Sequence, residues 1–342
     1  MEDNIMRLKK RSNILIASIG ILMFITVVLS GCKAKEAGET GKRMETTTEI
    51  TASATVEPTV TKEEEKQLIL TEADGTEVVF EKMPEKIVVI SYATSTIMDS
   101  LGINLAGISS TKRQLTETLK ALPMVGIPMR PDIEKILTIE PELVIMSHVF
   151  KGAQEKMFRD NGLKAYFINN QGYNDTIDNI RMFGDFFNKS EKAEELIDDI
   201  KEREEKILNG IKGKSSPKVL IIFGTTQSFQ MATSYSYSGS MVKMLGGDNI
   251  SDMVKSTENS YLPLSVENVI LQNPDIILRI THGSWESVKD SFKSEFEDND
   301  LWNTVSAVKN KRVYDLDPGL FHANPGMKVI DALEYLAGIM YP

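Results

Sequence analysis

Short apolar runs alternate with segments of helical spacing along most of this chain. Runs typical of buried strands lie at 86–91 (KIVVIS), 143–147 (LVIMS) and 165–169 (AYFIN), and a helical pattern follows each of them. Ahead of them, LILTEADGTEVVF alternates apolar and polar residues on both sides of Asp74-Gly75, which predicts a β-hairpin. Strands that alternate with helices are typical of parallel sheets covered by helices. The pattern therefore predicts an α/β fold.

One long segment interrupts this alternation. Residues 190–212 (SEKAEELIDDIKEREEKILNGIK) place apolar residues near helical spacing, with charged residues between them and no helix breaker before Gly210. After this segment, PKVLIIFG starts a new strand and the alternation resumes. We therefore predict two α/β lobes with mostly parallel sheets, at 66–189 and 214–342, joined by one long helix at 190–213.

The two predicted lobes carry a matching pattern. PDIEKILTIEPELVIM (131–146) and LSVENVILQNPDIILR (264–279) each place a glutamate seven residues before a proline, with an acidic residue and an apolar strand next. Glu134 precedes Pro141 in the first copy, and Glu267 precedes Pro274 in the second. Two unrelated helix–strand units could match by chance. One copy on each side of the long helix favours two related lobes.

The first 31 residues have the pattern of an export signal. Four basic residues precede an apolar run from Ile14 to Val28, and Leu-Ser-Gly-Cys follows, ending at Cys32. This ending resembles the lipobox of bacterial lipoproteins, in which the cysteine is lipidated and becomes the first residue of the mature chain. A transmembrane helix is the alternative, because the run approaches spanning length. Cys32 is the single cysteine of the chain, which favours lipidation and membrane attachment through that lipid, such as palmitate.

Composition adds a tether and excludes several partners. Residues 32–65 are rich in Thr, Glu and Ala and lack aromatic residues, so they cannot bury enough apolar area to offset their ordering entropy and are predicted to be a disordered tether. The formal charge of −10 argues against nucleic acid or an anionic membrane surface as direct partners. A single cysteine excludes an internal disulfide and a cysteine-based metal or redox site.

A histidine stands at the end of one predicted strand. In PDIILRITHGS (274–284) the apolar strand is followed by His282, and α/β proteins bind ligands at the carboxyl ends of their strands. Neutral imidazole is a common ligand of transition metals. From residue type alone, His282 is either a metal ligand or a residue that caps the next helix. His148 occupies nearly the same place in the first copy of the repeat, and His322 is interpreted as a loop residue.

The lipobox, the acidic tether, the two lobes joined by one helix and the glutamate in each lobe resemble the helical-backbone substrate-binding proteins of ABC importers. Within that class, VGIPMRPDIEKI (125–136) and the stretch from PDIILRITHGS to NKRVYDLD (274–317) resemble the heme-binding lipoproteins of the iron-regulated surface determinant systems of Gram-positive bacteria. The likeness runs from about residue 86 and is densest at 274–317. It implies a receptor on the outer face of the cell membrane that captures heme b between its lobes and delivers it to an ABC permease.

The resemblance also implies one iron ligand from each lobe. The family's coordinating histidine corresponds to His282 and its axial methionine to Met129, which lies on a predicted turn among prolines. A thioether favours ferrous iron, and a Met/His pair raises the reduction potential relative to two histidines. Most of the 17 methionines fill gaps in cores, so residue type alone would not single out Met129. His148 is a reserve ligand. Three tyrosines also lie in predicted cleft loops: Tyr92, Tyr173 and Tyr261.

The two heme propionates need partners for their negative charge. The start of the predicted helix at Thr94 and Ser95 offers free backbone N–H groups, and Lys112 and Arg113 are the nearest loop cations. Solvated surface charge is the commoner role of such cations, and that alternative stays open. Arg130 follows Met129 where the family would have an acidic residue, which either changes the propionate contacts or only borders the site.

The resemblance assigns Glu134 and Glu267 to docking, one on each permease subunit. Ordinary glutamates at helix N-termini are the alternative for either residue alone, and their equivalent places in the repeat favour docking. We further expect a monomer, small lobe movements limited by the long helix, and an upstream cell-wall heme carrier as donor.

Other functions fit the sequence less well. A ferric siderophore or cobalamin carrier on the same fold would need aromatic residues and arginines in the cleft and no Met/His pair. An iron–sulfur enzyme needs more cysteines than Cys32, and a Ser-His-Asp hydrolase needs a GxSxG nucleophile elbow, which the sequence lacks. A purely adhesive surface protein is compatible with the tether, but nothing in the paired repeats requires one. The sequence therefore predicts a transport receptor rather than an enzyme.

Overall fold

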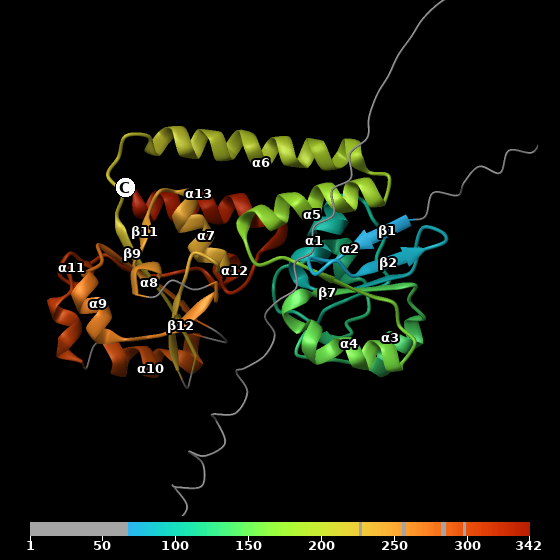
Figure 1. The fold of residues 1–342 in the computed structure, drawn as a ribbon, viewed down its shortest axis with the longest axis horizontal. Helices are drawn as coiled ribbons and strands as arrows, with labels where there is room; N and C mark the ends of the chain where they lie inside the picture. The colour runs from blue at the N-terminus through green and yellow to red at the C-terminus, as the bar shows by residue number, and fades with distance from the viewer. Residues whose placement is uncertain (1–67, 226–227, 255–257, 282–284, 297–298) are drawn as a thin grey trace, which may run out of the picture. The chain divides into compact units, whose positions relative to one another are not determined.

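The computed structural model describes residues 68–225, 228–254, 258–281, 285–296 and 299–342. The predicted leader, Cys32 and the tether lie outside the described residues, and so does His282. The described body has two α/β lobes joined by the long helix α6 (Ser190–Ile211), as the sequence predicted (Figure 1). In this part of the chain, no helix is both long and apolar enough to cross a membrane.

The first lobe is built on a parallel sheet in the order β4–β3–β7–β8. Successive side chains of a strand point to opposite faces, and Ile87 and Val89 of β3 join one core cluster while Val88 and Ile90 join another. Both faces are therefore covered, which explains why the strands are continuous apolar runs. The strands and helices of this lobe are β1 (Leu68–Thr71), β2 (Glu77–Phe80), β3 (Ile87–Ile90), α1 (Tyr92–Ser100), β4 (Gly107–Ile108), α2 (Glu117–Lys120), β5 (Gly126–Ile127), β6 (Arg130–Pro131), α3 (Ile133–Ile139), β7 (Leu143–Ser147), η1 (His148–Phe150), α4 (Lys151–Asp160), β8 (Ala165–Ile168) and α5 (Tyr173–Phe186).

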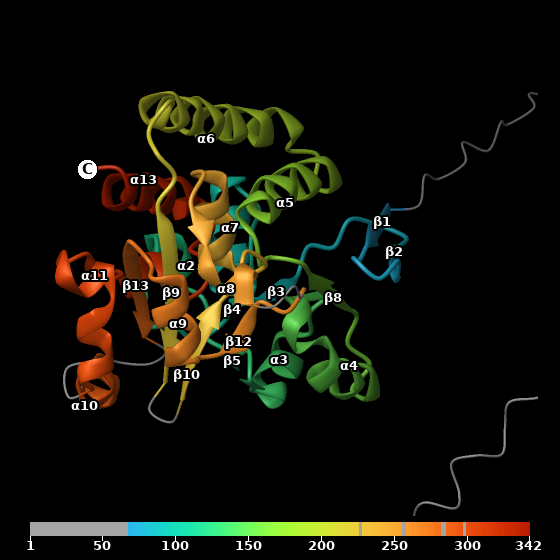
Figure 2. The same cartoon turned by 60° about the vertical axis from the view of Figure 1, so that its left-hand side comes forward.

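The second lobe has a mixed sheet in the order β12–β10–β9–β13–β14, of which Figure 2 labels β12, β10, β9 and β13. β11 pairs with β9. β9, β11, β13 and β14 pair in parallel, whereas β10 and β12 pair antiparallel at one edge. Its strands and helices are β9 (Lys218–Gly224), β10 (Phe229–Ala232), α7 (Tyr237–Met244), β11 (Asp248–Asn249), α8 (Ile250–Val254), β12 (Tyr261–Pro263), α9 (Val266–Gln272), β13 (Ile276–Thr281), α10 (Trp285–Phe296), η2 (Asp300–Thr304), α11 (Ser306–Lys309), β14 (Val313–Asp315), α12 (Pro318–Phe321), η3 (Gly326–Lys328) and α13 (Val329–Met340).

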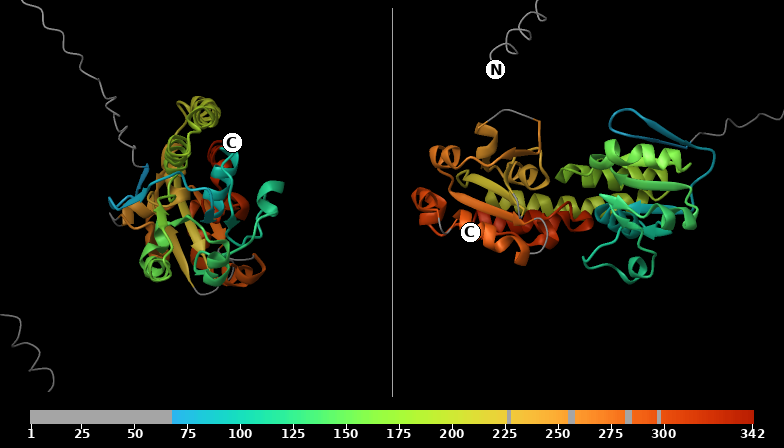
Figure 3. Two further views of the ribbon diagram at one scale, coloured as in Figure 1. Left: turned by 90° about the vertical axis from the view of Figure 1, so that its right-hand side faces the viewer. Right: turned by 90° about the horizontal axis from the view of Figure 1, so that it is seen from below.

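Helix α6 packs on helices from both lobes. Its buried residues Ala193, Ile197 and Ile200 lie on one face and join a core cluster that contains residues of both lobes. α6 lies along α5 of the first lobe and α13 of the second, as two nearly perpendicular views show (Figure 1, Figure 3). The approach to α5 is close, since a Cβ added at Gly184 would stand 2.3 Å from the Cβ of Ala193. The connection between the lobes is therefore packed along its length.

The predicted repeat has matching structure in the two lobes. α3 follows the N-cap Asp132 and α9 follows the N-cap Ser265, and each cap side chain accepts a hydrogen bond from a backbone N–H of the first turn. Both helices end at a residue with left-handed backbone, Glu140 (φ 52°) and Asn273 (φ 48°), directly before a proline. The parallel strands β7 and β13 come next. The same helix–strand unit therefore occurs in both lobes.

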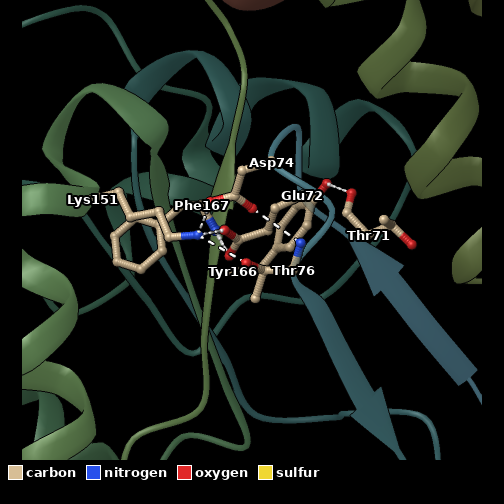
Figure 4. Close-up of polar contacts among 7 residues, drawn as sticks. All are labelled: Thr71, Glu72, Asp74, Thr76, Lys151, Tyr166 and Phe167. Carbon is tan, nitrogen blue, oxygen red and sulfur yellow. Dashed lines mark hydrogen bonds and ion pairs between the residues drawn. The ribbon is translucent and has the colours of Figure 1, made fainter. Parts of the chain in front are cut away.

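An ion cluster with two buried members, Glu72 and Lys151, fastens the β1–β2 hairpin to the first lobe. Lys151, at the start of α4, places its Nζ 2.5 Å from carboxylate oxygens of both Glu72 and Asp74 (Figure 4). Glu72 also accepts a hydrogen bond from the backbone N–H of Phe167 in β8, at 2.8 Å. The hairpin, α4 and β8 are thereby held at one place, and the N-terminus of α4 has a fixed position.

A cleft between the lobes as candidate binding site

A cavity of about 660 Å³ lies where residues of the two lobes meet. Its volume falls in the range of small-molecule sites, roughly 300–1,000 Å³. The first lobe contributes loops that follow its strands, and the second lobe contributes the start of α7, the edge of β12 and the loop after α12. The residues that line the cavity include Ser91, Tyr92, Arg113, Pro128, Met129, Ser147 and Phe150 of the first lobe, and Ser236, Tyr237, Ser260, Tyr261, His322 and Asn324 of the second.

Met129 lies in the cavity wall at the tip of a short hairpin. β5 and β6 pair antiparallel, so Pro128 and Met129 form the two-residue turn between them. The ring of Pro128 restricts its own φ. Gly126 has a φ of +87°, and a Cβ there would stand 2.7 Å from backbone atoms of Arg130 and Asp132. The Met129 side chain is 69% exposed. The structure thus places Met129 in the cleft, and its role as an iron ligand stays a prediction.

His322 brings the end of β13 against the cavity. Its ring lines the cavity, and its Nδ1 lies 3.0 Å from the carbonyl oxygen of Thr281, the last residue of β13. The next residue is His282, the predicted iron ligand, which lies outside the described residues. The interpretation of His322 as a loop residue missed this contact, because it depends on the approach of two segments 41 residues apart.

Arg113 places a positive charge in the cavity wall. Its guanidinium donates to the backbone carbonyls of Asn324 (3.3 Å) and Ala323 (3.4 Å) in the second lobe, and lies 4.7 Å from the centre of the Tyr92 ring. Burial lowers the pKa of Arg113, but the ordinary value is so high that the group stays charged. Lys112, the neighbouring candidate, is exposed and is not among the lining residues. Arg113 therefore both charges the cavity and connects the lobes.

The start of α1 borders the cavity through residues just before those predicted. Ser91 caps α1, and Ser91 and Tyr92 line the cavity. Thr94 and Ser95 are 1% exposed and are not among the lining residues. The Thr94 hydroxyl donates to Ser91 Oγ (3.0 Å), and the Ser95 hydroxyl donates to the Ser91 carbonyl (2.9 Å). An anion at this helix start would therefore meet Ser91 and Tyr92 first.

His148 follows β7 at the edge of the cavity without lining it. Its neighbours Ser147 and Val149 both line the cavity. The Nδ1 atom of His148 is buried and has no hydrogen-bond partner. Its role as a reserve ligand stays a prediction.

Tyr237 and Tyr261 line the cavity as uncharged phenols. Burial raises the pKa of Tyr261 and raises that of Tyr237 well above the ordinary value of 10. Both therefore keep their protons near pH 7. Tyr173 donates instead to Glu204 (3.0 Å) and does not line this cavity.

The sequence of this chain is similar to those of known proteins that bind ligands. Residues 87–320 match the profile of the periplasmic binding protein family. The chain belongs to this family. It is 33% identical over 257 residues to the high-affinity heme uptake system protein IsdE of Staphylococcus aureus, a match that covers 75% of this chain and 87% of that protein. The resemblance seen in the sequence is thereby confirmed.

Solved structures share this fold as well, and two of them have a third of their residues identical to this chain. The crystal structure of S. aureus IsdE complexed with heme matches with a TM-score of 0.69 at 33% identity, over 75% of this chain and 99% of that one. An ABC transporter substrate-binding protein from Listeria monocytogenes matches with a TM-score of 0.70 at 33% identity, over 76% and 99%. These relatives are substrate-binding proteins of transport systems, in line with the prediction that the chain is not an enzyme.

In this periplasmic binding protein, the two glutamates of the repeat stand on the surface. Glu134 lies in the first turn of α3 and Glu267 in the first turn of α9, and both are exposed. Hydrogen bonds from its own backbone N–H and from Ser265 lower the pKa of Glu267, so this carboxylate is charged near neutral pH. Their predicted role in docking is untested by this geometry.

The lining of the cavity limits which ligands it suits. Apolar and aromatic side chains, hydroxyls and the Arg113 guanidinium suit a largely apolar ligand that carries a few polar or anionic groups. Within the described ranges, no group of three or more His, Cys, Asp and Glu side chains could hold a metal ion.

Proposed function

We propose that this protein captures heme in the cleft between its lobes and delivers it to an ABC permease. The observation that carries the proposal is the Met129 turn, which places an exposed methionine of the first lobe in the wall of a cavity shared with the second. On the second lobe, the strand that precedes His282 ends beside the cavity-lining His322. The relative IsdE, named as a heme uptake protein and solved with heme, supports this ligand.

Met129 and His282 would bind the iron of heme b from opposite sides. Both are neutral ligands, and a thioether is weaker than an anionic ligand toward ferric iron. This suits a protein that must release its cargo to a transporter.

Arg113 would pair with a heme propionate. Two of its N–H groups donate to second-lobe carbonyls, and a guanidinium has five N–H donors in all. A charge-assisted bond to a carboxylate is therefore available without loss of the interlobe contact. Ser91 and Tyr92 border the same region of the cavity. Lys112, Thr94 and Ser95 do not line the cavity and would influence the propionates without direct contact.

A ferric siderophore or cobalamin is the alternative cargo on this fold. Arg113, Tyr92, Tyr237 and Tyr261 favour it, because aromatic rings and an arginine suit such ligands. Neither ligand needs a methionine thioether in the cavity wall. The position of Met129 therefore favours heme.

The remaining parts of the proposal concern location and partners. Lipidation of Cys32 would attach the chain to the outer face of the cell membrane, with residues 32–65 as the tether. Glu134 and Glu267 would each contact one permease subunit. Their exposure and their equivalent places in the two lobes support this role. The chain would act as a monomer and receive heme from a cell-wall carrier.

A hemin titration of the mature chain carrying Cys32→Ser tests the proposal. We expect a saturating one-to-one shift of the Soret band, and altered coordination bands in Met129→Ala and in His282→Ala. Met253→Ala is a matched control, because Met253 is an exposed methionine of α8 that does not line the cavity. His148→Ala tests the reserve ligand in the same way.

No Soret shift in the parent protein would refute heme capture. A ferric siderophore and cobalamin would then be titrated in its place, with quenching of tryptophan fluorescence as the readout. Binding of hemin with unchanged coordination bands in both ligand variants would keep heme as the cargo and reject the Met/His pair.

A further inference from the structure

We propose that Gln154 is a positioning residue that orients Met129 toward the bound ligand. The proposal rests on the proposed function, in which Met129 is an iron ligand. Gln154 lies on α4, is 8% exposed, and its Nε2 donates to the backbone carbonyl of Met129 at 3.3 Å. Gln154 is not among the residues that line the cavity. It would therefore act on the ligand only through the turn that carries Met129.

The Met129 side chain has little packing of its own. Its exposure of 69% means that few neighbouring atoms hold the thioether in one place. The direction in which it leaves the turn therefore depends on the backbone of Pro128 and Met129. The hairpin itself is small, because β5 and β6 have two residues each. A hydrogen bond from outside the hairpin is then an important restraint on the turn.

Gln154 can supply that restraint because α4 has a fixed position. The buried residues of α4 are Lys151, Gln154 and Phe158, which lie on one face at helical spacing. Lys151 is held by Glu72 and Asp74 at the first turn of the helix (Figure 4). Phe158 is fully buried in the core of the first lobe. Gln154 thus lies between two residues that fix the position of α4. Its hydrogen bond to the Met129 carbonyl therefore restrains the turn relative to the core of the first lobe.

Partners that orient a metal ligand through a hydrogen bond commonly change metal affinity about 10–100-fold when they are removed. We expect an effect of this size on the release of heme. Gln154→Leu and Gln154→Glu both remove the N–H donor, one with an apolar side chain and one with a side chain of the same length. A shared effect of two such different side chains points to the missing donor.

The experiment uses the full-length protein in detergent, loaded with hemin. The readouts are the charge-transfer absorption band of thioether-bound ferric heme and the rate of heme loss to excess apomyoglobin. We expect both Gln154 variants to weaken the band and to release heme about 10–100-fold faster than the parent. Asn249→Leu is the matched control, since Asn249 is 4% exposed and donates to the backbone carbonyl of Ala232 (2.8 Å) in the second lobe.

A double-mutant cycle with Met129→Ala separates positioning from general loss of structure. If Gln154 acts through Met129, Gln154→Leu has no further effect on heme release once Met129 is alanine. Equal effects in both backgrounds would overturn the proposal. The proposal would also be overturned if the parent bound heme through Met129 and both Gln154 variants kept the parent's charge-transfer band. Failure of the parent to bind heme would instead reject the proposed function, and the inference with it.

Discussion

Lys151 is a buried cation whose charge is balanced by two carboxylates. Its side chain is 11% exposed and that of Glu72 is 1% exposed, so this pair is shielded from solvent. Removing one partner of a buried ion pair leaves the other charge uncompensated, which costs about 3–5 kcal/mol. We therefore expect Lys151→Met to lower the free energy of unfolding by about 3–5 kcal/mol in chemical denaturation at pH 7.

The same comparison has a defined pH dependence. Hydrogen bonds from Lys151 and Thr76 lower the pKa of Asp74 below its ordinary 3.8, so its contribution to stability is present above pH 3.8 and is lost as the pH falls further. The pKa of Lys151 is raised above 10.5, although burial opposes the effect of the carboxylates, so its contribution is lost only at higher pH. The stability difference should be constant between about pH 5 and 9 and shrink toward pH 3.

Lys156→Met is the control for this residue. Lys156 lies on the same helix, but it is exposed and pairs with Asp160 at the surface. Surface pairs contribute about 0–1 kcal/mol. A loss in Lys156→Met as large as that in Lys151→Met, or a difference that grows below pH 4, would contradict the role given to the buried cluster.

At the scale of single residues, the sequence predicted which types of side chain the site contains better than which of them face the cavity. It named Met129, which the structure places in the cavity wall, and it named Lys112 and Arg113 together, of which Arg113 lines the cavity and Lys112 does not. The two are adjacent cations, and which one turns inward depends on the loop. Thr111 Oγ1 accepts a hydrogen bond from the backbone N–H of Arg113, and the guanidinium then lies over Tyr92. Contacts between distant segments decide this, and the local pattern does not contain them.

At the scale of elements, periodicity was a strong guide. The long helix was expected at 190–213, and α6 spans Ser190–Ile211, because its apolar residues repeat at helical spacing over six turns. The hairpin at β5 and β6 was not foreseen beyond a turn at Met129, since strands of two residues leave no periodicity to detect. The lobe boundaries drawn at 189 and 214 stay predictions.

The matched helices α3 and α9 lead to a prediction about docking. If Glu134 and Glu267 contact the permease, Glu134→Ala and Glu267→Ala should each weaken binding to permease in proteoliposomes by up to about 5-fold, because a surface ion pair contributes about 0–1 kcal/mol. The double variant should lose more, and its affinity for heme should be unchanged, since neither residue lines the cavity.

A double variant at Glu202 and Glu205 is the control, because these exposed glutamates lie on α6 rather than on the repeat. Equal losses in the two double variants would show that acidic charge in general, and not the repeat positions, attracts the permease. High salt should reduce the difference between the parent and the repeat variant, because salt screens surface charges.

At the scale of the whole described body, the lobes are joined by more than α6. One core cluster contains apolar residues of both lobes and of the helix. Asn324 donates to Thr176 (3.0 Å) and to the Asn170 carbonyl (3.2 Å) across the cleft. A Cβ at Gly326 would stand 2.0 Å from Thr96 Oγ1, so the loop of the second lobe lies directly on α1. Such contacts between distant segments could not be predicted from the sequence, which indicated only the helix.

These contacts lead to the expectation that heme binding moves the lobes little. Closure by a hinge would break the Asn324 bonds, separate Gly326 from α1 and pull Arg203 of α6 away from Asp331 (2.8 Å) and Glu334 (2.9 Å) of α13. The backbone of preorganised binding surfaces moves by about 1 Å or less on binding. Small-angle X-ray scattering with and without hemin should therefore show a change in radius of gyration below about 1 Å. Met129→Ala, which would bind hemin more weakly, serves as the reference for scattering from free hemin. A contraction of several ångströms would mean that the segment at Gly326 leaves α1 on binding. The lobes would then close about α6, and the cleft would not be preformed.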